Sequence, residues 1–124
     1  MFRLLIIPIV IILLVSCKCT DKYIFDFTEV DSVRVYDLKN QNNKEIINKE
    51  TLIYLNTLLN NNCYERNIKQ KIVPTFKILL TINKQENITI YTNGNFFDIY
   101  LKEKALGQYK LKENINAYLK ATFD

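Results

Sequence analysis

Residues 88–101 read ITIYTNGNFFDIYL, and this stretch decides the fold. Apolar residues recur at every second position on both sides of Asn93-Gly94, a dipeptide typical of a two-residue type I′ hairpin turn. A turn of that length pairs Ile90 with Phe97 and brings apolar side chains together on one face. The stretch therefore predicts an antiparallel hairpin with one buried face.

The hairpin is one part of a longer strand pattern. Residues 76–82 alternate in the same way, and a bend over residues 83–87 places Ile82 opposite Ile88. Residues 30–38 are a further strand candidate, enriched in β-branched residues, and residues 108–111 are a short final one. We therefore expect an antiparallel meander of four to five strands.

Two helices complete the predicted domain. Asn48 is a favourable N-cap, with Ile47 and Leu52 at the hydrophobic-staple positions, and leucines then recur at helical spacing up to Leu59. A second amphipathic pattern lies near the end of the chain, at Leu111, Ile115, Tyr118, Leu119 and Phe123. The expected fold class is α+β, with one helix after the first strand and a C-terminal helix packed on one face of the meander.

This order of elements resembles the β-α-β4-α arrangement of TATA-binding-protein-like folds, with a cystatin-like fold as the alternative. The resemblance concerns element order only and implies no DNA binding. The formal net charge is +4, and the basic residues are scattered along the chain. A nucleic-acid-binding domain needs Lys and Arg clustered on one face, so we expect no nucleic-acid partner.

The first seventeen residues resemble the signal peptide and lipobox of bacterial lipoproteins. Arg3 precedes twelve apolar residues, and Leu14-Val15-Ser16-Cys17 closes the segment. The apolar run is shorter than the roughly 20 residues of a membrane-spanning helix and contains Pro8. The resemblance implies cleavage between Ser16 and Cys17 and acylation of Cys17, for example by palmitate.

The lipobox divides the chain into a signal peptide (residues 1–16), a lipidated cysteine with a short linker (17–22) and one domain (23–124). The linker spans under about 20 Å, which predicts a domain held close to a membrane of the bacterial envelope. Tyr23, Phe25 and Phe27 alternate as an edge strand or an extended lead-in. Lys18 stands where some bacteria read aspartate as an inner-membrane signal, which favours the outer membrane if the cell has one.

Cys19 and Cys63 are the cysteines left if Cys17 carries lipid. An oxidising envelope permits a disulfide between them, but the sequence does not place them within bonding distance, so two unpaired thiols are the favoured expectation. The chain has no histidine, which removes Ser-His and Cys-His pairs and histidine metal sites. The acidic residues cluster only at Asp21, Asp26, Glu29 and Asp31 and match no calcium loop. We therefore expect no enzyme, no cofactor and no metal.

One face of the meander points away from the predicted core and offers a candidate binding surface. Its apolar members are Leu79, Tyr91, Phe96 and Tyr100, and the two-residue turn makes Tyr91 and Phe96 a cross-strand pair. Exposed aromatics favour a protein- or peptide-binding module of the inhibitor or immunity type. The alternatives are that these rings only stabilise the sheet, or that the domain is an accessory subunit of an envelope complex.

Overall fold

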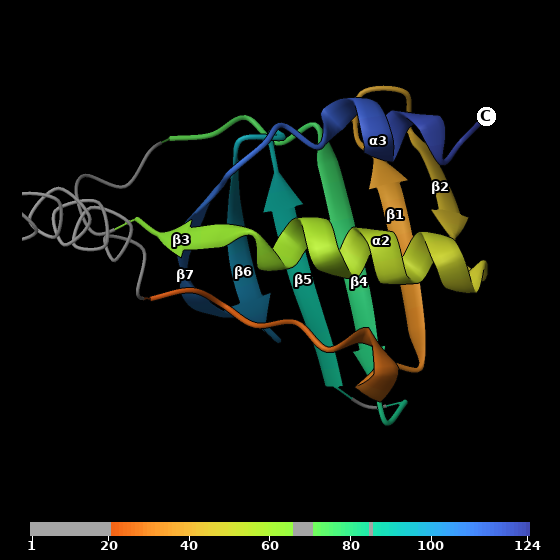
Figure 1. Cartoon of the computed structure of the whole chain (residues 1–124), viewed down its shortest axis with the longest axis horizontal. Helices are drawn as coiled ribbons and strands as arrows, with labels where there is room; N and C mark the ends of the chain where they lie inside the picture. Colours follow the sequence, from red (N-terminus) through yellow and green to blue (C-terminus); the bar gives the residue numbers. More distant parts are fainter. Residues whose placement is uncertain (1–20, 66–70, 85) are drawn as a thin grey trace, which may run out of the picture.

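A computed structural model describes residues 21–65, 71–84 and 86–124. Its elements, in chain order, are η1 (Phe27–Glu29), β1 (Ser32–Asp37), β2 (Asn42–Glu45), α2 (Lys49–Asn60), β3 (Asn62–Tyr64), β4 (Phe76–Ile82), β5 (Glu86–Thr92), β6 (Phe96–Leu101), β7 (Lys104–Leu111) and α3 (Asn116–Ala121). The strands form one antiparallel sheet in the order β2-β1-β4-β5-β6-β7-β3 (Figure 1).

The α+β class is confirmed, but the expected count of four to five strands is wrong, because this sheet has seven. The two unpredicted strands are β2 and β3, one at each edge. They also contradict the expected β-α-β4-α order, since β2 stands between β1 and α2, and β3 follows α2 directly. Both are short and mostly polar, so neither carries the alternation that marks a half-buried strand.

The central hairpin pairs β5 with β6 two residues away from the predicted register. Ile90 lies opposite Ile99, and Thr92 lies opposite Phe97. The connection is therefore a four-residue loop, in which the Asn93 side-chain oxygen accepts hydrogen bonds from the backbone N–H groups of Asn95 (3.0 Å) and Phe96 (2.9 Å). An asparagine that satisfies its own turn in this way favours a wider loop than type I′.

The β4–β5 hairpin is shifted by the same amount, because Ile82 pairs with Glu86 and Leu80 with Ile88. The bend is shorter than predicted, and Asn83 and Lys84 take the positive φ angles of 52° and 59° that a tight turn needs. A shift of two residues keeps every side chain on its predicted face, since the strand period is two.

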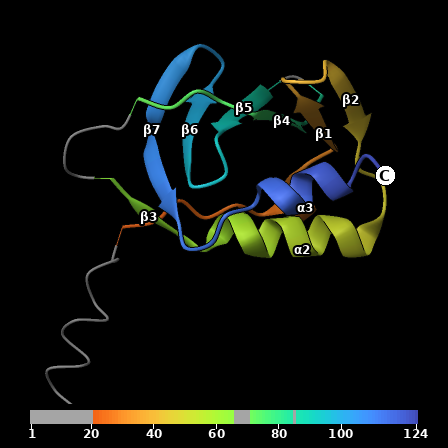
Figure 2. The same cartoon turned by 90° about the horizontal axis from the view of Figure 1, so that it is seen from above.

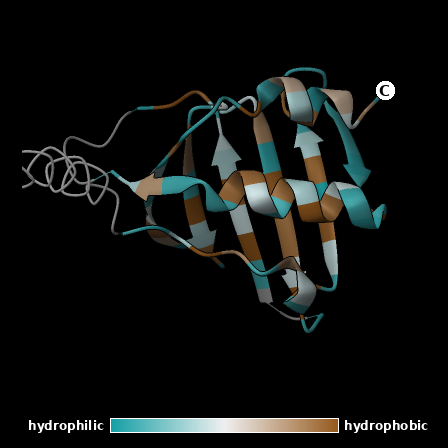
Figure 3. Ribbon diagram, in the orientation of Figure 1, coloured by the Kyte–Doolittle hydropathy of each residue, from teal (hydrophilic) through white to brown (hydrophobic). Residues whose placement is uncertain are grey.

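The core lies between the sheet and the two α-helices, which cover the same face (Figure 2). Alternate strand residues are buried there, and α2 adds the buried residues Leu55, Leu58 and Leu59. Figure 3 shows this as hydrophobic bands that recur along the strands and along one side of α2. A largely buried side chain of this type contributes about 1.5–3 kcal/mol, so this layer dominates stability.

The sequence pattern predicted the N-cap of α2 correctly but not the length of α3. The Asn48 side chain caps α2 by accepting from the backbone N–H of Thr51 at 3.1 Å, as predicted. The staple is wrong, because Ile47 is 81% exposed. Helix α3 is only six residues long, since Leu111 belongs to β7 and Ile115 is the residue before the helix.

The segment before η1 is held by asparagine side chains rather than by a strand. Asn62 bonds to both backbone polar groups of Tyr23, and Asn60 does the same with Phe25, its side-chain oxygen lying 2.6 Å from the Phe25 nitrogen. Asn56 accepts from the N–H of Phe27 at 3.1 Å. The extended lead-in is therefore fixed along α2, with every second residue clamped.

Candidate functional site

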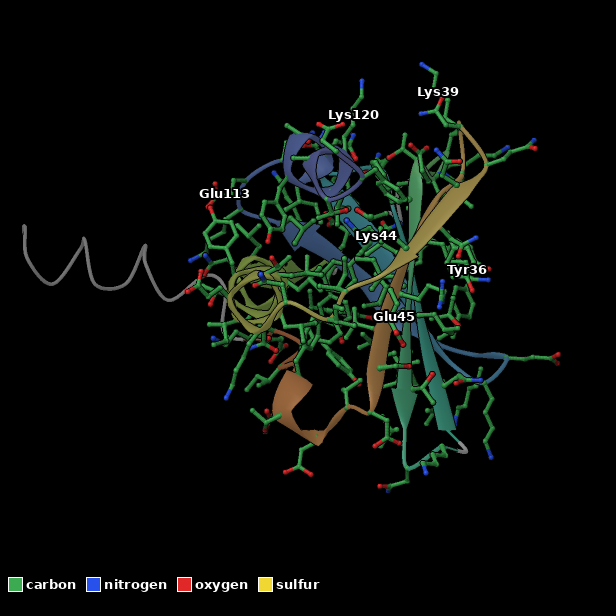
Figure 4. The ribbon with its side chains drawn as sticks, turned by 90° about the vertical axis from the view of Figure 1, so that its right-hand side faces the viewer. Tyr36, Lys39, Lys44, Glu45, Glu113 and Lys120 are labelled. Carbon is green, nitrogen blue, oxygen red and sulfur yellow. The ribbon has the colours of Figure 1, made fainter. Side chains whose placement is uncertain are left out.

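The sheet face opposite the helices is covered by no helix in the described part of the chain (Figure 2). Tyr36 projects from β1 on this side, away from α2 and α3 (Figure 4). The face is built by the strand residues that alternate with the buried ones, and all of these are partly exposed. We call it the open face; its members are Arg34, Tyr36, Lys77, Leu79, Thr89, Tyr91, Asp98 and Tyr100.

Aromatic contacts organise the middle of the open face. The rings of Tyr91 and Tyr100 meet edge to face, with centroids 5.9 Å apart and an interplanar angle of 83°. The Lys77 ammonium lies 4.9 Å from the centroid of the Tyr36 ring, within cation–π range. These contacts hold the rings against the sheet, so the surface is shaped before any partner arrives.

The predicted Tyr91–Phe96 cross-strand pair is wrong. Tyr91 lies opposite Asp98, and Phe96 lies opposite Lys110 of β7. The cause is the wider loop, which moves β6 along β5 by two residues and places Phe96 beyond the end of their ladder. Leu79, Tyr91 and Tyr100 lie on the open face, whereas Phe96 lies at its border.

Two polar side chains on the open face, Asp98 and Arg34, are hydrogen-bonded to neighbouring side chains. Asp98 accepts a hydrogen bond from the side-chain amide of Gln108 at 2.9 Å, and Gln108 is only 3% exposed. Arg34 donates to the side-chain oxygen of Asn43 at 2.7 Å. The face therefore combines tyrosine, leucine and a few charged side chains, some of which are held by hydrogen bonds.

Two acidic residues near the start of the domain accept hydrogen bonds from backbone N–H groups. Asp26 caps η1 by accepting from the hydroxyl (2.5 Å) and the backbone N–H (3.0 Å) of Thr28, and the hydroxyl contact most strongly lowers the pKa of Asp26. Asp31 accepts from the N–H of Lys84 at 2.6 Å. Within residues 21–65, 71–84 and 86–124, no His, Cys, Asp and Glu side chains group so as to hold a metal ion.

A hollow of about 440 Å³ lies between β2, the start of α2 and α3, and no sequence pattern predicted it. Tyr118 lines it and donates to the carbonyl of Thr51 at 3.2 Å, and burial raises the pKa of Tyr118. Lys44 of β2 donates to the carbonyl of Thr122 at the end of α3 (2.9 Å), where a cation is favourable. The helix pattern had marked Tyr118 only as a core residue.

The predicted lipidation and cleavage residues, Ser16 and Cys17, lie outside the described residues, as does Cys19. Cys63 lies in β3 and is disulfide-bonded, with its partner also outside the described ranges. The chain entering the domain is placed nearby, because the carbonyl of Asp21 accepts from the N–H of Tyr64 at 2.7 Å.

Comparison with known proteins gives no family. No protein-family model matches the chain, and no curated protein matches it. Among solved structures it is similar to the "Crystal Structure of Putative Lipoprotein from Clostridium perfringens", with 18% identity and a TM-score of 0.47, covering 74% of this chain and 79% of that one. A likeness this distant assigns neither family nor function. No helix among the described residues is both long and apolar enough to cross a bilayer.

Proposed function

We propose that this chain is an envelope lipoprotein, anchored through acylated Cys17, whose open face binds a protein or peptide. The observation that carries the binding role is a sheet face that bears Tyr36, Tyr91 and Tyr100 and is covered by no helix of the described chain. Tyrosine is enriched at protein interfaces because one end of the ring is apolar and the other can hydrogen-bond. An inhibitor or immunity protein works by such capture without chemistry.

The binding role is tested by paired variants on opposite faces. Leu79→Lys with Tyr100→Ser changes the open face, whereas Tyr54→Ser changes an exposed tyrosine (52%) on α2. Crosslinked partners from the solubilised envelope should be lost with the first variant and retained with the second. Equal recovery from both variants would remove the open face from consideration.

The anchor is tested separately by intact mass. Wild type should yield a diacyl or triacyl chain that begins at Cys17, and Cys17→Ala should stay unprocessed and unacylated. Stable anchoring requires more than one acyl chain, so the mass also predicts membrane retention. Fractionation of a two-membrane cell then tests the expected outer-membrane location, and an unprocessed wild-type chain would overturn the anchor.

A second candidate function, an accessory subunit of an envelope complex, is favoured by the short connection at Asp21. Because Asp21 is already bonded to β3, only three residues lie between Cys17 and the folded domain. A subunit that depends on its height above the membrane should fail when a flexible spacer is inserted after Lys18. A protein that captures free partners should tolerate the spacer.

A further inference from the structure

The start of the described chain is hydrogen-bonded to the edge of the sheet that β3 forms. Asp21 is hydrogen-bonded to Tyr64 of β3, and Asn62 clamps Tyr23 from the same strand. The step from Cys17 to Asp21 covers four residues, which reach about 14 Å when fully extended. If Cys17 carries the lipid, the β3 edge of the sheet is the edge nearest the membrane.

The surface at that end combines exposed apolar and basic side chains. Ile24 is 70% exposed, Tyr64 41% and Val73 80%, although all three are large and apolar. Exposed lysines accompany them in the entering segment, in the segment before β4 and in β7. In Figures 1 and 2 the entering segment and the segment before β4 both start at the end where β3 and β7 lie, and they run from there toward η1 and β4. We call this the anchor-end patch; its members are Lys22, Ile24, Tyr64, Lys71, Val73 and Lys110.

Bilayer headgroups are the occupant that fits both the chemistry and the space. Exposed aliphatic side chains, a tyrosine and long lysines are the residues that sit at a membrane interface, where lysine keeps its charge among the phosphates. A tether of about 14 Å leaves no room for a globular protein, since even a small domain is about 30 Å across. Asp21 and Glu65 are also at this end, so the attraction depends on the placement of the lysines rather than on a large net charge.

We propose that the anchor-end patch rests on the lipid surface, with Ile24 and Val73 in the interfacial layer and the lysines on anionic phosphates. This rests on the proposed anchor at Cys17. The proposal also defines how the domain is oriented on the membrane. The strands run parallel to the membrane surface, and β2 is the strand farthest from it. Six strand spacings, or about 29 Å, separate β2 from β3. The open face is then turned sideways and is accessible to a partner.

The chain has no tryptophan, so a single introduced one reports its own depth. Val73→Trp is the test, and Ile47→Trp is its control, because the two sites are 80% and 81% exposed and Ile47 adjoins β2. Each full-length, acylated protein is placed in phosphatidylcholine–phosphatidylglycerol vesicles that contain brominated phosphatidylcholine. We expect several-fold stronger quenching at residue 73 than at residue 47; equal quenching overturns the proposal. Ile24→Trp replaces Val73→Trp if that variant fails to fold.

Two further measurements separate the contribution of the lysines from that of the lipid anchor. Replacing Lys22 and Lys71 by Gln, or omitting phosphatidylglycerol, should reduce quenching at residue 73 by at least half if the lysines bind anionic phosphates; no change overturns that part. Intact mass is read first. An unacylated chain refutes the anchor and with it this orientation, whereas an acylated chain without differential quenching refutes the patch alone.

Discussion

The side-chain amide of Asn62 pairs with the backbone of Tyr23 as another peptide group would, accepting from its N–H and donating to its C=O, both at 2.8 Å. The same amide also donates to the carbonyl of Leu59 at 2.6 Å, and Asn62 is only 2% exposed. One buried side chain therefore joins the end of α2, the start of β3 and the entering chain.

Replacing Asn62 by Ala should destabilise the domain by about 1–3 kcal/mol, because the partly buried backbone groups of Tyr23 and the buried carbonyl of Leu59 lose their partner. With a urea dependence of about 1–3 kcal/mol per M, the unfolding midpoint should fall by roughly 1 M. Asn61→Ala is the matched control, since Asn61 is the exposed neighbour. Equal midpoints for the two variants would contradict the clamp.

Gly94→Ala should be among the most destabilising changes in the central hairpin. Gly94 has φ +97°, and an added Cβ would lie 2.6 Å from Cγ of Asn116. Positive φ and steric overlap each oppose a side chain, so we expect a loss of about 2 kcal/mol or more. Thermal unfolding measures it.

A double-mutant cycle with Asn116→Ala separates the two causes of the Gly94 effect. Asn116 donates to the carbonyl of Asn93 (2.8 Å), so its own removal should also cost stability. Because that removal relieves the overlap with Asn116, although Oδ1 of Asn114 still lies 2.7 Å from the added Cβ, the double variant should be more stable than the sum of the single effects predicts. Strict additivity would show that the overlap with Asn116 makes no contribution.

These contacts explain why the sequence predicted faces but not registers. Ile90 and Phe97 both lie in the core, as their alternation predicted, yet Ile90 pairs with Ile99. Alternation alone cannot distinguish registers two residues apart. The register is favoured at the loop by the Asn93 side chain and also by a tertiary contact, in which the carbonyl of Gly94 accepts from the N–H of Ile115 at 3.1 Å. Nothing local to the hairpin encodes that partner.

Local sequence patterns also failed to predict the contacts at the edges of the sheet and part of the candidate site. Asn60 and Asn62 stand just after the last leucine of the helix pattern, and nothing in that pattern indicates that their side chains hold a separate segment 35 and 39 residues away. Leu79, Tyr91 and Tyr100 were placeable on the open face because face follows from period two. The contact between Tyr91 and Tyr100 required the true register and was not predictable.

The domain should lose stability in acid through Asp37. Its carboxylate accepts from the side-chain amide of Asn40 at 2.8 Å, and this hydrogen bond is the main cause that lowers the pKa of Asp37 below its usual 3.8. A lowered pKa means that the unfolded chain binds the proton more readily. The stabilisation is therefore complete above about pH 4 and is lost as the pH falls through the lower, folded-state pKa.

Asn40→Ala tests this acid dependence without touching the core, because Asn40 is exposed. Removal of the donor should move the pKa of Asp37 back up, so the variant should lose less stability than wild type between pH 4 and pH 2. Urea midpoints measured across that range give the slope, and the exposed Asn42→Ala is the control. Parallel curves for wild type and Asn40→Ala would exclude the Asn40 side chain as the cause of the acid dependence, since the backbone N–H groups of Lys39 and Asn40 still donate to Asp37 in the variant.

Thiol labelling should show that the mature protein has no reactive cysteine until it is reduced. Cys63 is disulfide-bonded, and if Cys17 carries lipid, Cys19 is the cysteine left to pair with it. Asp21, which follows Cys19 by two residues in the chain, bonds to Tyr64, the neighbour of Cys63. Iodoacetamide should therefore add no mass to the acylated chain before reduction and two groups after it. Cys63→Ser should expose one reactive thiol, at Cys19, and two labelled cysteines without reduction would contradict the pairing.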